Sequence, residues 1–412
     1  MNIFFTNKDF RQLTINQWIS TVGDTIFYLA FINHVSSAPF APLAIFLISL
    51  SETAPQILQI FTGAIADFQT KRIFKYTFLT FVKFVLYFLV ALLLSGTAFS
   101  LGSVIIICLI NLISDTISFF SGAMLTPIFI KLISEDMASA MGFRQATINL
   151  VRTLSNLAGG LLLGFISIEL LAFINALTFL LSFLGILLIK KSLMRYEETI
   201  ELEQKPINLK NFWQHLLDSV KQLLAFKGAM KLFVIISISQ AVLTVVTPVV
   251  TLLLIKHPFL GLETGQSLAL LTTIELIGVI GGSLFSGNLL KNISTKTSLY
   301  AGQFMEGLLL IGFFSNNFIL ITFAVFGDAL VTGITAPRLQ AAVFSLIPEK
   351  SMGAVQSAIS AITIVLPSLL SILLVSIATS LGTPAVSLTL GALLLLGLYL
   401  LKDFREFLVT SN

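Results

Sequence analysis

The chain has 412 residues, of which 56% are hydrophobic and only 11% are charged, and its mean hydropathy is +0.98. A soluble domain carries about a quarter charged residues, so the composition excludes an ordinary soluble protein and indicates an integral membrane protein. The net charge of +4 does not indicate a nucleic-acid partner, because the basic residues lie at the termini and on alternate connections instead of forming a patch.

Apolar segments long enough to cross a bilayer recur along the chain, joined by mostly short connections. About 20 residues are needed for a helix to span the hydrocarbon. The predicted spans are residues 12–33, 41–66, 73–95, 101–128, 142–168, 170–190, 229–255, 267–289, 297–314, 317–337, 354–380 and 384–402. The sequence therefore predicts an all-α membrane protein with twelve transmembrane helices.

One long polar segment divides these spans into two sets of six. We expect an N-terminal half at 1–190, a cytoplasmic linker with an amphipathic helix at 191–228, and a C-terminal half at 229–412. The element Met141-Gly142-x-x-Gln145 recurs as Met352-Gly353-x-x-Gln356, which indicates a duplicated six-helix unit and two pseudo-symmetric halves.

The distribution of charge predicts the topology. Lys and Arg residues gather on the termini and on one set of alternate connections, which places both termini in the cytoplasm and predicts a multi-pass plasma-membrane protein. The polar start runs directly into the first span, so we expect no cleaved signal peptide. The lone cysteine, Cys108, excludes an internal disulfide, and no cluster of residues predicts a metal site.

Four of the predicted spans carry a polar stripe along one helical face. The stripes consist of Gln17, Thr21, Asp24 and Tyr28; of Asn111, Asp115, Ser118 and Gly122; of Gln240, Thr244, Thr247 and Thr251; and of Asp328, Thr332 and Thr335. Steps of three and four residues keep each stripe on one side of a helix. Polar groups at membrane depth avoid lipid, so the stripes predict a shared polar path, as in a transporter.

The fifth predicted span carries Asn149 and Arg152 at the same cavity-facing spacing. An arginine within the hydrocarbon needs a partner, and by helix position its nearest carboxylates are expected to be Asp24 and Asp115. The candidates for proton coupling are therefore Asp24, Asp115, Arg152, Glu275 and Asp328. For each carboxylate a purely structural role, satisfied by a neighbouring basic or hydroxyl group, remains an alternative.

The connection after the second span reads Gly63-Ala-Ile-Ala-Asp67-Phe-Gln-Thr-Lys71-Arg72. It resembles the signature of the major facilitator superfamily in Gly63, Asp67, Lys71 and Arg72. Phe68 stands where the family usually has Arg, and Thr70 where it usually has Gly. The resemblance implies twelve helices, a central cavity, alternating access and a cytoplasmic gate at this loop. A plain topology signal made of basic residues is the alternative interpretation.

Two further patterns resemble branches of that superfamily. Gly142, Gly159 and Gly160 match parts of the glycine-rich motif of antiporters, although helix packing explains small residues equally well. Gly23-Asp24 with a following Phe27 resembles the first helix of macrolide and multidrug exporters. In this fold the third and ninth helices are peripheral, so the resemblance implies that Lys83 is a packing or snorkelling residue and that Glu306 is a structural carboxylate satisfied by a neighbouring basic or hydroxyl group.

These observations predict a transporter that exports hydrophobic or amphipathic small molecules by proton antiport. Its expected partners are the substrate and the bilayer, it is expected to act as a monomer, and it uses the proton motive force without a cofactor. Transport of a defined metabolite, peptide or siderophore is the main alternative. No catalytic or nucleotide-binding motif appears in the sequence, so we expect neither an enzyme nor a non-transporting receptor.

Overall fold

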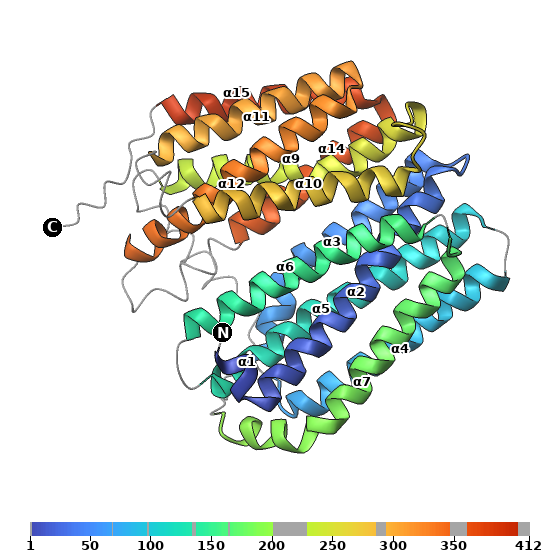
Figure 1. The fold of residues 1–412 in the computed structure, drawn as a ribbon, viewed down its shortest axis with the longest axis vertical. Coiled ribbons are helices and arrows are strands. Elements are labelled where there is room, and N and C mark those ends of the chain that lie inside the picture. Colours follow the sequence, from blue (N-terminus) through green and yellow to red (C-terminus); the bar gives the residue numbers. More distant parts are fainter. Residues whose placement is uncertain are drawn as a thin grey trace. The chain divides into compact units, whose positions relative to one another are not determined.

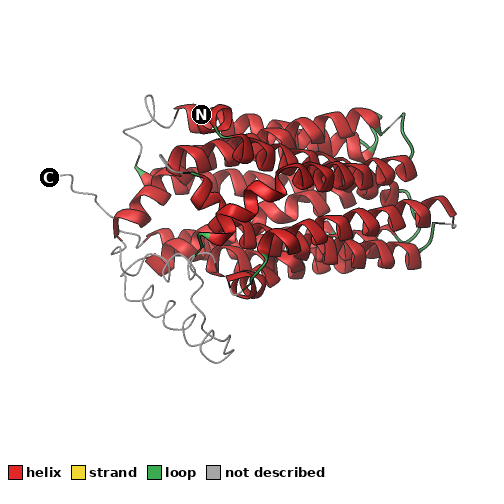
Figure 2. Ribbon diagram, turned by 90° about the horizontal axis from the view of Figure 1, so that it is seen from below, coloured by secondary structure: helices red, strands yellow, loops and turns green. Residues whose placement is uncertain are grey.

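A computed structural model of the chain describes residues 2–67, 69–96, 99–133, 137–163, 165–200, 229–285, 294–346 and 361–402. Within these ranges the regular structure is helical throughout, without a strand (Figure 2). The predicted all-α class is therefore confirmed. Internal contacts divide the chain into two compact units, Met1–Ile207 and Asn208–Asn412.

The amino-terminal unit is a bundle of long helices (Figure 1). Its described helices are α1 (Asn2–Thr6), α2 (Lys8–Ser36), α3 (Ala41–Asp67), α4 (Arg72–Gly96), α5 (Leu101–Leu132), α6 (Met137–Leu162) and α7 (Ile168–Glu198). Helix α4 packs along α7, α3 packs along α5, and α2 lies against both α6 and α7. Helix α2, near the start of the unit's sequence, therefore packs against its last two helices.

The carboxy-terminal unit is built in the same manner. Its described helices are α9 (Ala229–Lys256), α10 (Thr264–Phe285), α11 (Thr295–Ser315), α12 (Phe318–Leu346), the π-helix η2 (Ala361–Val365), α14 (Leu366–Leu381) and α15 (Thr383–Lys402). Helix α12 packs between α10 and α11, α11 also packs on α15, and α14 packs on α9. A Cβ atom at Gly282 of α10 would overlap the carbonyl oxygen of Leu330 on α12, so glycine permits this close helix contact.

Nine of the described helices are long and apolar enough to cross a membrane. Helices α2, α6 and α11 are not among them, because polar and charged side chains lower their hydropathy. The chain is thus a multi-pass membrane protein by helix length and composition. The total of twelve spans and the cytoplasmic placement of the termini remain predictions.

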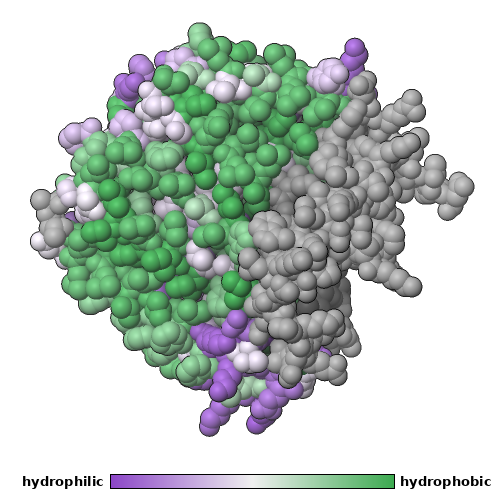
Figure 3. All heavy atoms as spheres, turned by 180° about the vertical axis from the view of Figure 1, so that it is seen from behind, coloured by the Kyte–Doolittle hydropathy of each residue, from purple (hydrophilic) through white to green (hydrophobic). Residues whose placement is uncertain are grey.

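Helix α4 shows how these helices divide their surfaces. Phe74, Phe78 and Leu92 are more than half exposed, whereas Lys83 and Tyr87 are buried. This arrangement reverses the pattern of a soluble protein, because apolar side chains face outward and polar ones face the bundle interior. Figure 3 shows that hydrophobic residues cover much of one face of the molecule. Such a surface suits contact with lipid.

The last turns of α7 anchor the start of α4. The Glu197 carboxylate accepts hydrogen bonds from the backbone N–H groups of Arg72 and Ile73, at 3.2 Å for Ile73. A carboxylate at a helix N-terminus satisfies donors that have no partner within the helix. Helix α7 consequently continues beyond residue 190, where the linker was expected to begin. Residues 201–228 of that predicted linker lie outside the described residues.

Candidate functional site

A lysine lies in the interior of the amino-terminal unit, near the middle of α4. The Lys83 Nζ atom is 3.6 Å from Asp24 Oδ2 on α2. It also donates a hydrogen bond of 2.7 Å to Ser118 Oγ on α5 and lies 3.9 Å from the centre of the Phe179 ring on α7. The ammonium group therefore joins four helices. A charge at this depth is stable only when such partners compensate for its lost hydration.

Asp24 is held from a second side by α7. Asn175 Nδ2 donates to Asp24 Oδ1 at 3.4 Å. The neighbouring Gly23 packs so tightly on α7 that a Cβ atom there would overlap Thr178 Oγ1 and Asn175 Oδ1. About one third of the Asp24 side chain is exposed, compared with 9% of the Lys83 side chain. Asp24 is thus the accessible partner of a buried cation.

Tyr87 lies one turn beyond Lys83 on α4, and it contacts Asn111 of α5, which connects two more carboxylates. Tyr87 donates a hydrogen bond of 2.7 Å to Asn111 Oδ1. Asn111 Nδ2 lies 2.8 Å from Glu52 Oε1 and 3.3 Å from Asp115 Oδ2. The Asn111 amide oxygen thus accepts from Tyr87 of α4, and its amide nitrogen donates to Glu52 of α3 and Asp115 of α5. Asn111 is the central residue of this part of the site.

We call this set of contacts the amino-terminal charge network, consisting of Asp24, Glu52, Lys83, Asn111 and Asp115. It contains three carboxylates and one ammonium group, so it holds more acidic than basic side chains. Groups of three metal-binding side chains close enough to hold an ion are absent from the described part of the chain. The chemistry that this network suits is the exchange of protons and of ion-pair partners between neighbouring carboxylates.

The contacts of two basic residues differ from those expected from the sequence, although Arg152 still acts electrostatically on Glu52. Lys83 is not a snorkelling or packing residue, because it makes the ion pair with Asp24. The expected pairing of Arg152 with Asp24 or Asp115 is not present: Arg152 is exposed on α6 and lies beyond 4.0 Å from every described carboxylate. One sequence signal would have identified Lys83. It stands about 17 Å or more from either end of α4, too far for its side chain to reach either end of the span.

The other residues of the first stripe and of the fifth span do not take part in the hydrogen bonds and the ion pair of the network. Arg144 Nε donates to Gln17 Oε1 at 2.8 Å, which ties α6 to α2. Thr21, Tyr28 and Asn149 are partly buried. These residues line the same unit as the network without making its central contacts.

The residues of the predicted gate are only partly described. Arg72 is buried, and its Nη1 donates to the carbonyl oxygen of Met124 at 3.2 Å. Lys71 is exposed, and the space beside Gly63 is open. The side chain of Asp67 lies outside the described residues. Arg72 therefore fastens α4 to α5, while the role of the loop as a gate remains a prediction.

The hydroxyl groups in the polar stripes of the carboxy-terminal unit mostly donate hydrogen bonds to backbone carbonyl groups of their own helices. The Thr244 hydroxyl donates to the Gln240 carbonyl at 2.7 Å, and both side chains are exposed on α9. Thr247 is partly buried one turn further along the same helix. The remaining candidates, Glu275 on α10 and Asp328 and Thr332 on α12, are partly or fully buried.

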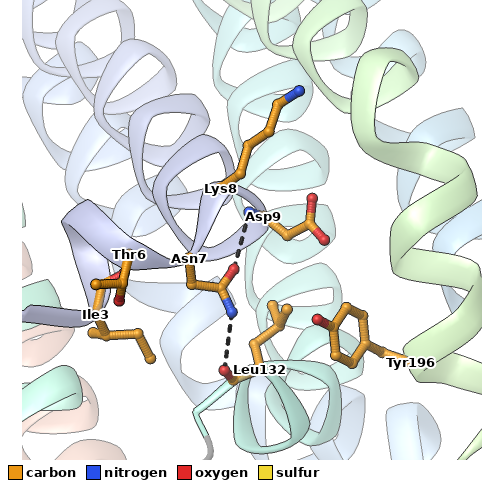
Figure 4. Close-up of a pocket in the computed structure, with 7 residues that line it drawn as sticks. All are labelled: Ile3, Thr6, Asn7, Lys8, Asp9, Leu132 and Tyr196. Carbon is orange, nitrogen blue, oxygen red and sulfur yellow. Dashed lines mark hydrogen bonds between the residues drawn. The ribbon is translucent and has the colours of Figure 1, made fainter.

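A separate cavity of about 420 Å³ lies at one end of the amino-terminal unit (Figure 4). Its lining consists of Ile3, Thr6, Asn7, Lys8, Asp9, Leu132 and Tyr196. Asn7 lines the cavity, its Oδ1 caps the start of α2, and its Nδ2 donates to the Leu132 carbonyl at 3.2 Å. These bonds join α2 to the end of α5, and the cavity is separate from the charge network.

The fold is shared with transporters of known structure. A nucleoside transporter, NupG, aligns with a TM-score of 0.67 and 14% identity over 98% of this chain and 100% of its own. A peptide transporter, POT, solved with sulfate, aligns with a TM-score of 0.69 and 13% identity over 96% of this chain and 94% of its own. A POT family transporter bound to 5-aminolevulinic acid gives 0.68 and 14%, over 97% and 96% of the two chains.

These neighbours are nucleoside and peptide transporters, and this chain shares their all-helical fold. At this level of identity the likeness concerns the fold. No protein-family model matches the sequence, and no curated protein sequence is significantly similar to it.

Proposed function

We propose that the chain is a secondary active transporter that moves a small molecule across the plasma membrane by alternating access, with six membrane spans in each half. Three observations support a transporter over an enzyme or a receptor: the apolar helices, the fold shared with nucleoside and peptide transporters, and polar groups inside a membrane bundle. Buried charges in membrane proteins commonly belong to ion and substrate pathways.

The observation that carries the proposal is the ion pair between Lys83 and Asp24. Neutralising Asp24 with a proton removes its attraction to Lys83. A cargo cation that approaches Asp24 competes with the proton and with Lys83 for the same carboxylate. Asp24 is the more exposed of the two partners, so it is the group that a proton or a cargo reaches first. Proton binding and cargo binding would thus exclude one another, which is the requirement for antiport.

We propose cationic amphipathic compounds as the cargo, exported in exchange for protons. The amino-terminal charge network holds three carboxylates against one ammonium group, and this excess favours a cation over an anion. An uncharged metabolite or a peptide is the second candidate. It is supported by the nucleoside and peptide transporters that share the fold.

The test uses protein reconstituted in liposomes under an imposed pH gradient. The panel contains lipophilic cationic dyes, macrolides, dipeptides and nucleosides, and it compares wild type, Asp24→Asn and the control Glu198→Gln, whose carboxylate is exposed at the end of α7. We expect gradient-driven movement of the cationic dyes that Asp24→Asn abolishes and Glu198→Gln retains. Movement of dipeptides or nucleosides alone would favour the second candidate. Equal transport by wild type and Asp24→Asn would refute the coupling role.

A further inference from the structure

The carboxy-terminal unit contains a second group of buried polar side chains, which the proposed coupling mechanism does not use. Gln303 and Glu306 lie one turn apart on α11, and Asp328 lies on the adjacent α12. Their exposed fractions are 4%, 1% and 4%. All three stand well inside their helices, so they have no access to water at the helix ends.

The hydrogen bonds within this group are incomplete. Gln303 Nε2 donates to Glu306 Oε2 at 3.1 Å, so the amide and the carboxyl group face each other. Three buried oxygens have no hydrogen-bond partner among the described residues: Gln303 Oε1, Glu306 Oε1 and Asp328 Oδ2. All three are acceptors. Apart from the Ser239 hydroxyl on α9, which acts on Glu306, the described residues offer these oxygens no hydrogen, and a buried acceptor without one costs about 1 to 3 kcal/mol.

The helices around Glu306 provide no compensating cation in the part of the chain described. On the packed helices α9, α11 and α15, the described basic side chains are Lys256, Lys296 and Lys402, and each lies in the first or last turn of its helix. Glu306 stands roughly 14 Å or more from either end of α11.

The other titratable groups nearby do not supply a positive charge either. Asp328 on α12 and Glu275 on α10 are themselves acidic, and Tyr300 and Tyr399 are exposed on the outer faces of α11 and α15. An ionised Glu306 would thus be a buried, unpaired negative charge beside a second carboxylate, which is strongly unfavourable.

We propose that Glu306 is a proton-binding site of the carboxy-terminal unit. A proton taken from solvent forms an O–H bond at Glu306 Oε1, and this hydroxyl donates to Gln303 Oε1. The amide and the carboxylic acid then make two antiparallel hydrogen bonds, and one proton supplies the partner that two of the three orphan oxygens lack.

The tight packing favours a proton over a metal cation. A Cβ atom at Gly397 of α15 would lie 2.6 Å from Gln303 Oε1, so the α15 backbone closes the space beside this oxygen. A sodium ion needs several oxygens around a common centre, whereas a proton needs only a second oxygen at hydrogen-bond distance.

The test measures the proton itself and needs no transported cargo, so its outcome is independent of the proposed transport function. Infrared spectra of purified protein in detergent at neutral pH report the carbonyl stretch of protonated carboxyl groups. Glutamate labelled with ¹³C at the side-chain carboxyl carbon separates these groups from aspartate. The variants are Glu306→Gln, Glu275→Gln and the control Glu263→Gln, whose side chain is exposed.

We expect a label-shifted carboxylic-acid band in wild type that disappears in Glu306→Gln and persists in Glu275→Gln and Glu263→Gln. Glu306→Gln should fold, because its new amide N–H can donate to Gln303 Oε1 in place of the hydroxyl. If that variant is not recovered, a labelled band that persists in both Glu275→Gln and Glu52→Gln decides the question. Absence of such a band, or its loss in Glu275→Gln alone, overturns the proposal.

A second arm separates a proton from a metal cation. Thermal unfolding of wild type is followed in sodium and in choline chloride at equal ionic strength. We expect equal midpoints in the two salts. A midpoint that rises in sodium and ceases to do so in Glu306→Gln would identify a sodium site and overturn the proposal.

Discussion

Removing the positive charge of Lys83 without shortening the side chain tests the amino-terminal charge network directly. In Lys83→Met the carboxylate of Asp24 loses its cation and keeps only the weak hydrogen bond from Asn175. Two unit charges 3.6 Å apart attract each other by about 5 kcal/mol at an effective dielectric constant of about 20. Solvent reaches one third of Asp24 and screens the pair, so we expect a smaller loss of stability, about 2 to 3 kcal/mol.

The assay is thermal unfolding of purified protein in detergent at neutral pH, in which a loss of this size lowers the midpoint by roughly 5 to 10 °C for a unit of this length. Lys191→Met is the matched control, because Lys191 is exposed on α7. The double variant Lys83→Met, Asp24→Asn removes both charges and should recover about 2 kcal/mol relative to Lys83→Met. The reasoning is refuted if Lys83→Met behaves as Lys191→Met does, or if the second substitution recovers nothing.

Two glycine pairs test the helix contacts that position the sites. Gly23→Ala places a Cβ atom against Thr178 and should destabilise the protein by about 1 to 3 kcal/mol, whereas Gly122→Ala enters open space and should be neutral or slightly stabilising. Equal melting temperatures for the two variants would contradict this. Gly282→Ala meets the backbone of α12 and should destabilise similarly, whereas its neighbour Gly281→Ala meets nothing within 4 Å. Thermal unfolding of both variants, followed by circular dichroism, measures the difference. A Gly282→Ala variant as stable as Gly281→Ala would show that α12 can shift away from α10 at little energetic cost.

The positions of the helices follow closely from hydropathy, because the membrane imposes a length on each apolar segment. The predicted span 101–128 coincides with the start of α5, and 384–402 coincides with almost all of α15. The ends that were missed lie where a helix continues after its apolar part. Helix α7 runs to Glu198, since its last turn gains a contact with the start of α4 that hydropathy does not register.

The partners within the candidate site were much less predictable. Periodicity placed Asp24, Asn111 and Asp115 on polar faces, but the rotation of one helix against another decides which faces meet. Arg152 has the spacing expected of a cavity residue, but its side chain is exposed. Lys83 lies on a helix that was expected to be peripheral, but it forms the ion pair with Asp24. Contacts between helices are long-range properties, and a single sequence does not specify them.

The excess of carboxylates over ammonium groups in the amino-terminal charge network has an electrical consequence for a transport cycle. Asp24, Glu52 and Asp115 together carry two more negative charges than Lys83 balances when all four are ionised. If protons and cargo alternate in balancing this excess, two protons exchanged for a monovalent cation would move one net charge across the membrane in each cycle. The same exchange for a divalent cation would move none. A membrane current recorded during transport would therefore count the protons that the network releases for each molecule of cargo.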